Sequence, residues 1–216
     1  MSRLILAVDT TSEYGSVALL RGDELLDEMP LHAPKGFAQV LYGHLAEILE
    51  RQALKVGDID CFAAASGPGS FTGVRVGLAC VKGLAEAVGR PAVAVSNLQA
   101  IALFGTAPLR AAVLDAHRGE VYGAVYDAEA RLVTDESVAP FDAWIETLPA
   151  GELEFVTSGF APPLAGTRFE RAAMRLAPRV LAGAIARLAS RAEPRDPAAL
   201  DANYVRRSDA ELLWKE

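Results

Sequence analysis

Short apolar runs, separated by turn residues, recur along the first half of this chain and predict buried strands. Five segments have this character: 4–8, 16–20, 24–30, 61–65 and 92–95. The first of them leads into Asp9, and Gly15 marks the turn before the second. The polar triplet 21–23 has the composition of a hairpin turn between the second and third.

Segments with apolar residues at every third and fourth position predict the helices between these strands. One helix is expected between Pro34 and Leu54, from six apolar positions: Phe37, Val40, Leu41, Leu45, Ile48 and Leu49. A second helix, Val74–Val88, directs one apolar stripe toward the sheet and ends at Gly89. Ser96 and Gln99 fit a capping box that opens a third helix toward Phe104.

The same order of elements begins again at Arg110. Strands are predicted over 110–114, 120–126, 131–135 and 154–159, with a helix around 141–147 and a closing helix over 180–192. A repeat of this length indicates a duplicated domain rather than a solenoid. We therefore expect an α/β protein of two lobes, 1–105 and 106–216, each with a mixed five-stranded sheet and helices.

The stretch from Gly67 to Gly77 joins a predicted strand to a predicted helix. Gly67 and Gly69 allow backbone conformations closed to other residues, and Ser70 and Thr72 both fit an N-cap. This arrangement presents backbone N–H groups to an anion, and a tight connection without a ligand explains it equally well. Its spacing excludes a P-loop, a dinucleotide fingerprint and a nucleophile elbow.

Gly73, Gly77 and Cys80 form a second stripe on the same predicted helix, and all three are small. A Gly inside a helix costs about 1 kcal/mol relative to Ala, so two of them indicate that another element packs closely there. We expect this stripe to be exposed on the isolated chain and to be covered by a partner or by a second copy.

Composition limits the class of protein and its location. The 216 residues are 51% hydrophobic, and no run approaches the ~20 apolar residues of a membrane span. The net charge of −7 argues against nucleic-acid binding by the chain alone. Cys61 and Cys80 lie in apolar runs, which is typical of free thiols in a cytoplasmic protein. The three histidines, at 32, 44 and 117, lack metal-ligand spacing, so no metal site is expected.

Two lobes of this kind describe the architecture shared by actin, sugar kinases and Hsp70 proteins. In it, nucleotide lies between the lobes, and a carboxylate at the end of each first strand manages metal and phosphate. Asp9, followed by Thr10, and Asp115, followed by Arg118, occupy those places. Each Asp also fits the simpler role of closing its own turn by an Asx hydrogen bond, and the sequence leaves both roles open.

Four stretches, in register from end to end, make the chain resemble the TsaB (YeaZ) family. They are Ile5-Leu6-Ala7-Val8-Asp9-Thr10-Thr11, the glycine-rich stretch, Asp115-Ala116-His117-Arg118-Gly119-Glu120-Val121-Tyr122, and the tail from Asn203 to Lys215. The sequence departs from the family in the first predicted helix, which carries Phe37-Ala38-Gln39 where the family often has His-Ser-Glu.

The resemblance implies a duplicated actin-like (Hsp70-like) fold and a partner role. It implies pairing with the catalytic TsaD protein and action with the ATPase TsaE, which together transfer threonylcarbamoyl to a tRNA adenosine. It further implies no catalytic residue, metal or cofactor in the isolated chain, ATP or ADP only at the partner interface, and tRNA contact only through the complex. The small-residue stripe predicts in addition a homodimer through the first lobe when the partner is absent, formed by the helices near Phe37–Leu49 and Val74–Val88. The expected interface residues are Leu41, Gly67, Gly69, Ser70, Phe71, Thr72, Gly73, Arg75 and Gly77.

The alternative is a self-sufficient nucleotide-dependent enzyme of the actin-like superfamily. Its ATP cleft would be formed by the glycine-rich stretch together with Asp9, Thr10, Asp115 and Arg118. Against it, the first turn lacks the Gly that lets backbone wrap phosphate in such kinases, and Ser158-Gly159-Phe160 is short for an adenosine-binding loop. A protease is not supported either, because no HExxH is present and no catalytic triad is suggested by spacing.

Overall fold

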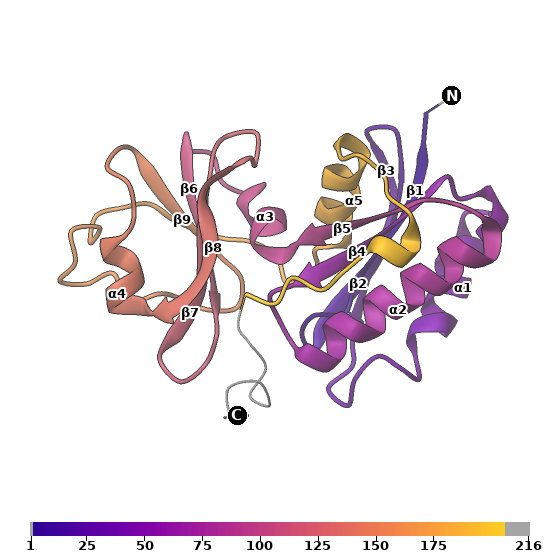
Figure 1. Ribbon diagram of the computed structural model, residues 1–216, viewed down its shortest axis with the longest axis horizontal. Coiled ribbons are helices and arrows are strands. Elements are labelled where there is room, and N and C mark those ends of the chain that lie inside the picture. The colour runs from indigo at the N-terminus through magenta and orange to yellow at the C-terminus, as the bar shows by residue number, and fades with distance from the viewer. Residues whose placement is uncertain (1, 206–216) are drawn as a thin grey trace. The chain divides into compact units, whose positions relative to one another are not determined.

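β1 (Leu4–Asp9) lies at the centre of a five-stranded sheet in the computed structural model, which describes residues 2–205 (Figure 1). β2 (Tyr14–Arg21) and β3 (Glu24–His32) continue from it as an antiparallel meander. β4 (Cys61–Gly67) and β5 (Ala92–Ser96) pair parallel on its other side, which gives the order β3-β2-β1-β4-β5. Every residue of β1 and β4 is buried, so this sheet is covered on both faces.

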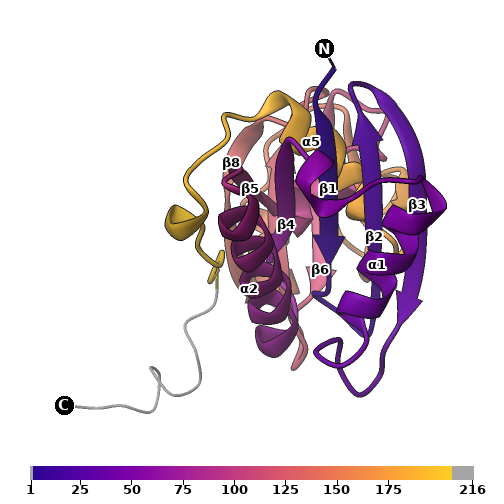
Figure 2. The same cartoon turned by 90° about the vertical axis from the view of Figure 1, so that its right-hand side faces the viewer.

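Helices supply that cover. α1 (Leu41–Arg51) and α2 (Phe71–Val88) lie side by side on one face, and α5 (Ala182–Arg191) packs on the other, as Figure 2 shows. The predicted apolar stripe of α2 is confirmed, because Val74, Leu78, Val81 and Ala85 are all buried. Two short 3₁₀ helices, η1 (Val56–Asp58) and η2 (Pro197–Ala199), pack near α2.

The ends of the helices follow the sequence signals. Ser70 is the N-cap of α2, because its side-chain oxygen accepts the N–H of Gly73 at 3.3 Å, whereas Thr72 lies inside the helix. Gly89 ends α2 in the left-handed region, with φ 64°. The hydroxyl of Ser96 accepts the N–H groups of Leu98 and Gln99 and so begins α3 (Asn97–Ala102).

A second five-stranded sheet has the order β10-β9-β6-β7-β8. β6 (Leu109–Asp115), β7 (Glu120–Tyr126) and β8 (Leu132–Pro140) form an antiparallel meander, and β9 (Leu153–Thr157) pairs parallel with β6. β10 (Met174–Leu176) pairs parallel with β9 at the edge. The sequence analysis missed this strand, because its three residues are all exposed and show no apolar run.

α4 (Phe141–Glu146) closes an aromatic core on this second sheet. The Trp144 ring lies edge-on to Phe155, with 6.4 Å between centroids, and Phe155 meets Phe169 at 5.5 Å. Gly123 on β7 faces the Trp144 ring so closely that any side chain there would overlap it. The lack of a side chain at Gly123 is therefore what allows α4 to pack on the sheet.

The two sheets belong to separate structural units. The first unit extends to Ala100 and includes Arg179–Ala202, and the second contains Ile101–Pro178 and resumes at Asn203. The predicted lobes, 1–105 and 106–216, therefore differ from the observed units: the closing helix, α5, packs on the first sheet. This helix contacts β1 and β2, and its small residues Ala182, Ala186 and Ala189 are fully buried. The family-like tail from Arg206 to Lys215 lies outside the described residues.

The strand orders of the units are equivalent, because each has a meander of three strands followed by two parallel strands on the other side of the first. The predicted duplicated actin-like fold is confirmed in this order. Among the described residues, no helix combines the length and the hydropathy needed to cross a membrane.

Candidate functional site

The turn after β1 is organised by the carboxylate of Asp9, which is 2% exposed. Its Oδ1 accepts the N–H of Thr11 at 3.0 Å and the hydroxyl of Thr11 at 2.7 Å. Burial raises the pKa of Asp9, against the opposing effect of its hydrogen bonds from Thr11 and Asn97. Asp9 therefore closes its own turn, as the simpler of the two sequence readings expects.

Asn97, at the start of α3, connects this turn to the glycine-rich stretch. Its Nδ2 donates to the hydroxyl of Thr11 at 2.7 Å, and its Oδ1 accepts the N–H of Gly67 at 3.1 Å. The sequence analysis did not single out Asn97, because the adjacent capping residue Ser96 accounted for the local pattern. The result is a buried polar network that joins the ends of β1 and β4 to the start of α3.

The glycine-rich stretch packs directly on the same turn. The N–H of Ser70 donates to the carbonyl of Thr11 at 2.6 Å, and the hydroxyl of Thr10 donates to the carbonyl of Gly73 at 2.8 Å. A Cβ at Gly69 would lie 2.5 Å from the Thr11 carbonyl oxygen. The N–H groups of Gly67 and Ser70, which could have held an anion, are thus bonded within the chain. The glycine-rich stretch itself occupies the space next to the turn.

The two glycines in the small-residue stripe of α2 face this turn, and no residue of the stripe is exposed. Gly77 and Cys80 are buried and Gly73 is half-buried, so the expectation of an exposed stripe is wrong. A Cβ at Gly77 would lie 2.6 Å from the Thr10 hydroxyl oxygen. The element that packs closely against these glycines is the turn after β1 in the same chain, not a partner.

On the opposite face of the first sheet, Glu28 occupies the N-terminus of α5. Its Oε1 accepts the N–H of Gly183 at 2.8 Å, while the hydroxyl oxygen of Ser16 accepts the N–H of Ala182 at 2.9 Å. Helix N-termini bind anions through such N–H groups. Here the carboxylate of the chain itself takes that place.

The second unit repeats the Asp turn in an exposed form. Asp115 Oδ1 accepts the N–H of His117 at 2.7 Å, and Oδ2 lies 3.4 Å from His117 Nδ1. His117 and Arg118 both have left-handed backbone, with φ 62° and 57°. The side chain of Asp115 is 45% exposed, so the two predicted cleft carboxylates share a local role but differ in burial.

The outward side of α1, of the residue before it and of α2 carries the large exposed apolar side chains among the described residues of the first unit: Val40 (40%), Tyr42 (59%) and Phe71 (45%). Arg75 Cζ lies 3.8 Å from the centroid of the Phe71 ring. Tyr42 hydrogen-bonds to Cys80 and so links the two helices. We call Val40, Tyr42, Phe71 and Arg75 the helical face.

The structure divides the predicted interface residues into two groups. Gly69, Ser70, Phe71, Thr72 and Arg75 are exposed, whereas Gly67 and Gly77 are buried in their own unit and Gly73 is half-buried. Leu41 is 1% exposed and belongs to the core beneath α1, so its selection as a contact residue is wrong. Its position in the apolar stripe of the helix was the signal for a core role.

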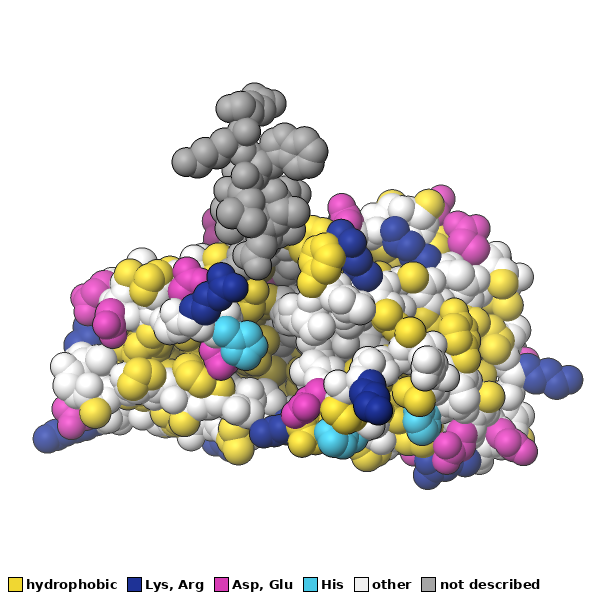
Figure 3. All heavy atoms as spheres, turned by 90° about the horizontal axis from the view of Figure 1, so that it is seen from below, with side chains coloured by type: hydrophobic (Ala, Val, Ile, Leu, Met, Phe, Trp, Pro, Cys, Tyr) yellow, Lys and Arg dark blue, Asp and Glu magenta, His cyan; other side chains and the backbone are white. Residues whose placement is uncertain are grey.

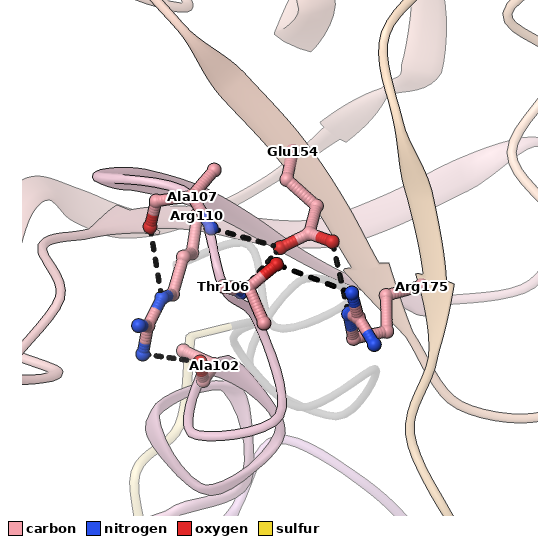
Figure 4. Close-up of polar contacts among 6 residues, drawn as sticks. All are labelled: Ala102, Thr106, Ala107, Arg110, Glu154 and Arg175. Atoms are coloured by element: carbon pink, nitrogen blue, oxygen red, sulfur yellow. Dashed lines mark hydrogen bonds and ion pairs between the residues drawn. The ribbon is translucent and has the colours of Figure 1, made fainter.

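A charged cluster in the second unit escaped the sequence analysis. Figure 4 shows Glu154 accepting the N–H groups of Thr106 (2.6 Å) and Ala107 (3.2 Å) and pairing with Arg175 Nε at 2.9 Å. Burial alone would raise the pKa of Glu154, but these hydrogen bonds and Arg175 lower it. Arg110 anchors the same connection by donating to the carbonyls of Ala107 and Ala102. A glutamate inside an apolar strand was the available signal.

The remaining charged and metal-binding side chains of the described residues indicate no metal site, and those drawn in Figure 3 indicate no basic surface. On the face drawn in Figure 3, basic side chains stand among acidic ones and form no continuous basic surface over the described residues. Within residues 2–205, no three His, Cys, Asp or Glu side chains are grouped to hold a metal ion. Cys61 and Cys80 are buried free thiols, and burial raises the pKa of each to about 11.

Known proteins are similar to this chain in sequence and in fold. A model of the family described as TsaD, tRNA N6-adenosine threonylcarbamoyltransferase, matches residues 28–173. The tRNA threonylcarbamoyladenosine biosynthesis protein TsaB of Bacillus subtilis is 30% identical over 227 residues, which cover 98% of this chain and 98% of that protein. The chain belongs to the TsaB (YeaZ) family.

Further relatives of this chain support its assignment to the TsaB family. TsaB of Escherichia coli is 36% identical over 130 residues, 58% of this chain and 55% of that protein. The solved structure of YeaZ from Pseudomonas aeruginosa has a TM-score of 0.75 at 28% identity and covers 94% of this chain and 99% of that one. Family membership connects this chain with tRNA threonylcarbamoyladenosine biosynthesis.

Proposed function

We propose that this chain is a non-catalytic subunit of the tRNA threonylcarbamoyl-transfer machinery. In this proposal it pairs with a TsaD-like catalytic protein and acts with a TsaE-like ATPase, in the cytoplasm, and meets tRNA only within that complex. Family membership supports the pathway, and one structural observation supports the non-catalytic role. The turn that would manage phosphate in an actin-like enzyme is packed by Gly69, Ser70 and Gly73 of the same chain.

Two buried or half-buried carboxylates of the first unit also have hydrogen-bond partners within it. Asp9 is bonded to Thr11, and Glu28 holds the N-terminus of α5. A nucleotide entering at this end of the sheet would have to displace those internal contacts, each of which is worth about 1.5–3 kcal/mol because a charged group takes part. This favours the subunit role over the self-sufficient nucleotide-dependent enzyme.

We further propose the helical face as the partner surface. Tyr42 and Phe71 are aromatic residues, and Arg75 is stacked on one of them; aromatic residues and arginine are the side chains enriched at interface hot spots. Gly69, Ser70 and Thr72 lie beside Phe71 and are exposed. In the absence of the catalytic partner we expect the same face to pair two copies of this chain. ATP or ADP, if bound, is expected only where the partner completes the site.

Binding measurements on two matched variants test this surface. Phe71→Ser removes an exposed apolar side chain from the helical face, and Leu132→Ser removes one of similar exposure (49%) from β8 in the second unit. Fully burying such a side chain contributes ~1.5–3 kcal/mol, so Phe71→Ser should weaken binding of the TsaD-like protein by about ten- to a hundredfold. Leu132→Ser should leave it unchanged. Equal affinities for both variants and the parent chain would overturn the surface assignment.

A further inference from the structure

Three planar side chains from separate segments of the first unit stack on one another. Tyr14, at the start of β2, and His32, at the end of β3, have ring centroids 4.5 Å apart and planes inclined by only 14°. Arg179, which precedes α5, places its Cζ 4.5 Å from the centroid of the Tyr14 ring. We call Tyr14, His32 and Arg179 the stack.

The sheet register explains why these groups meet. Tyr14 and His32 are directly opposite on β2 and β3, and Tyr14 shares its strand face with Ser16, two residues on, which contacts the N-terminus of α5. The stack therefore lies on the α5 face, next to the N-terminus of that helix. Arg179 arrives there because the chain turns into α5 three residues later.

The outer members of the stack are exposed and keep their hydrogen-bonding groups available. His32 and Arg179 are both exposed, and Tyr14 is half-buried. Among the described residues, neither the imidazole nor the guanidinium makes a hydrogen bond or an ion pair. An arginine whose guanidinium lies over an aromatic ring and whose N–H donors have no partner in the described part of the chain is already arranged for a planar or phosphate-bearing ligand.

We propose that the stack contacts RNA, by receiving an unstacked base against its outer planes and a neighbouring phosphate on Arg179. Proteins recognise single-stranded and loop RNA in this way, with bases stacked on aromatic rings or guanidinium planes. This inference rests on the proposed function, since the net charge of −7 requires that a complex supply most of the affinity for RNA. It assigns this chain a direct part in holding the tRNA.

The test uses the chain assembled with the TsaD-like and TsaE-like proteins and a tRNA substrate. Arg179→Gln is the test variant. Arg191→Gln, which removes the same charge from an exposed position at the other end of α5, is the control. Stacking of one base changes affinity by about 5- to 150-fold, so the KM for tRNA should rise by that factor in Arg179→Gln with kcat and partner affinity unchanged. Arg191→Gln should match the parent chain.

Two substitutions of Tyr14 test the stack independently of Arg179. Tyr14→Leu should raise the KM for tRNA as Arg179→Gln does, and Tyr14→Phe, which keeps the ring, should restore it. An unchanged KM in Arg179→Gln with intact partner binding would overturn the stack proposal alone. Weakened partner binding with an unchanged KM would assign the stack to a protein contact and likewise refute RNA. If the parent chain does not bind the TsaD-like protein, the proposed function fails and this inference fails with it.

Discussion

Replacing Gly77 by Leu should destabilise the first unit rather than disturb pairing. Gly77 is buried, and a Cβ there would lie 2.6 Å from the hydroxyl oxygen of Thr10, which itself donates to the carbonyl of Gly73. Leu improves helix propensity by ~0.8 kcal/mol, but overpacking costs ~1–3 kcal/mol and the displaced hydrogen bond ~1 kcal/mol. The net loss is therefore about 1–3 kcal/mol, or roughly 3–10 °C in Tm for a chain of this size.

Gly83 on the same helix is the matched control. It is exposed, and a Cβ there would meet no atom within 4 Å, so Gly83→Leu should keep the propensity gain and melt at or slightly above the parent temperature. Calorimetry of the thermal unfolding of both variants measures their Tm values and distinguishes overpacking from an exposed glycine. A Gly77→Leu variant that melts like the parent but no longer pairs would show that α2 presents its glycines to a partner, contrary to the packing described above.

Two further predictions concern buried titratable groups. Glu154→Gln should lower Tm at pH 7, because charged hydrogen bonds contribute ~1.5–3 kcal/mol. The pKa of Glu154 is lower in the folded chain than its ordinary value of 4.5, so this contribution is complete above pH 4.5 and is lost as the pH falls through the lowered pKa. The difference in Tm between the variant and the parent chain should therefore shrink on acidification, and a constant difference across pH 3–7 would contradict the Glu154–Arg175 account. Cys61 and Cys80 are buried and have pKa values of about 11, so at pH 8 both should resist alkylation by iodoacetamide in the native chain and react after unfolding. Mass spectrometry measures the alkylation, and rapid alkylation of either thiol in the native chain would show that it is not buried as described.

The hydrophobic pattern predicted most of the fold because most strands and helices here, unlike the exposed edge strand β10, carry their own periodicity. β1, β4 and the stripe of α2 follow directly from apolar spacing, and the second copy of the pattern predicted the second sheet. The position of α5 did not follow, because its Ala- and Gly-rich face suits either sheet. The signal that favours the first sheet is the continuous apolar character of β1, which requires cover on both faces.

The candidate site was predictable only in part, because a local sequence pattern does not state which distant element a residue contacts. The turn role of Asp9 and of Asp115 was one of two roles that a strand end allows, and the hydrogen bonds of the structure decide for it. The small size of Gly73 and Gly77 correctly indicated close packing, but a sequence does not state which element packs there; in this chain it is the turn containing Thr10. Asn97 and Glu28 act across distances of 30 and 155 residues along the chain, so local patterns gave no sign of them.

Reconstitution of tRNA modification tests the central claim most directly. The chain alone, a TsaD-like protein with a TsaE-like ATPase, and all three together should be incubated with unmodified tRNA, ATP and the threonylcarbamoyl donor, and the modified nucleoside measured by mass spectrometry. The account predicts no product from the chain alone and product that depends on adding it to the other two. Modified tRNA formed by the chain alone, or full activity of the other two without it, would contradict the role as a non-catalytic but required subunit.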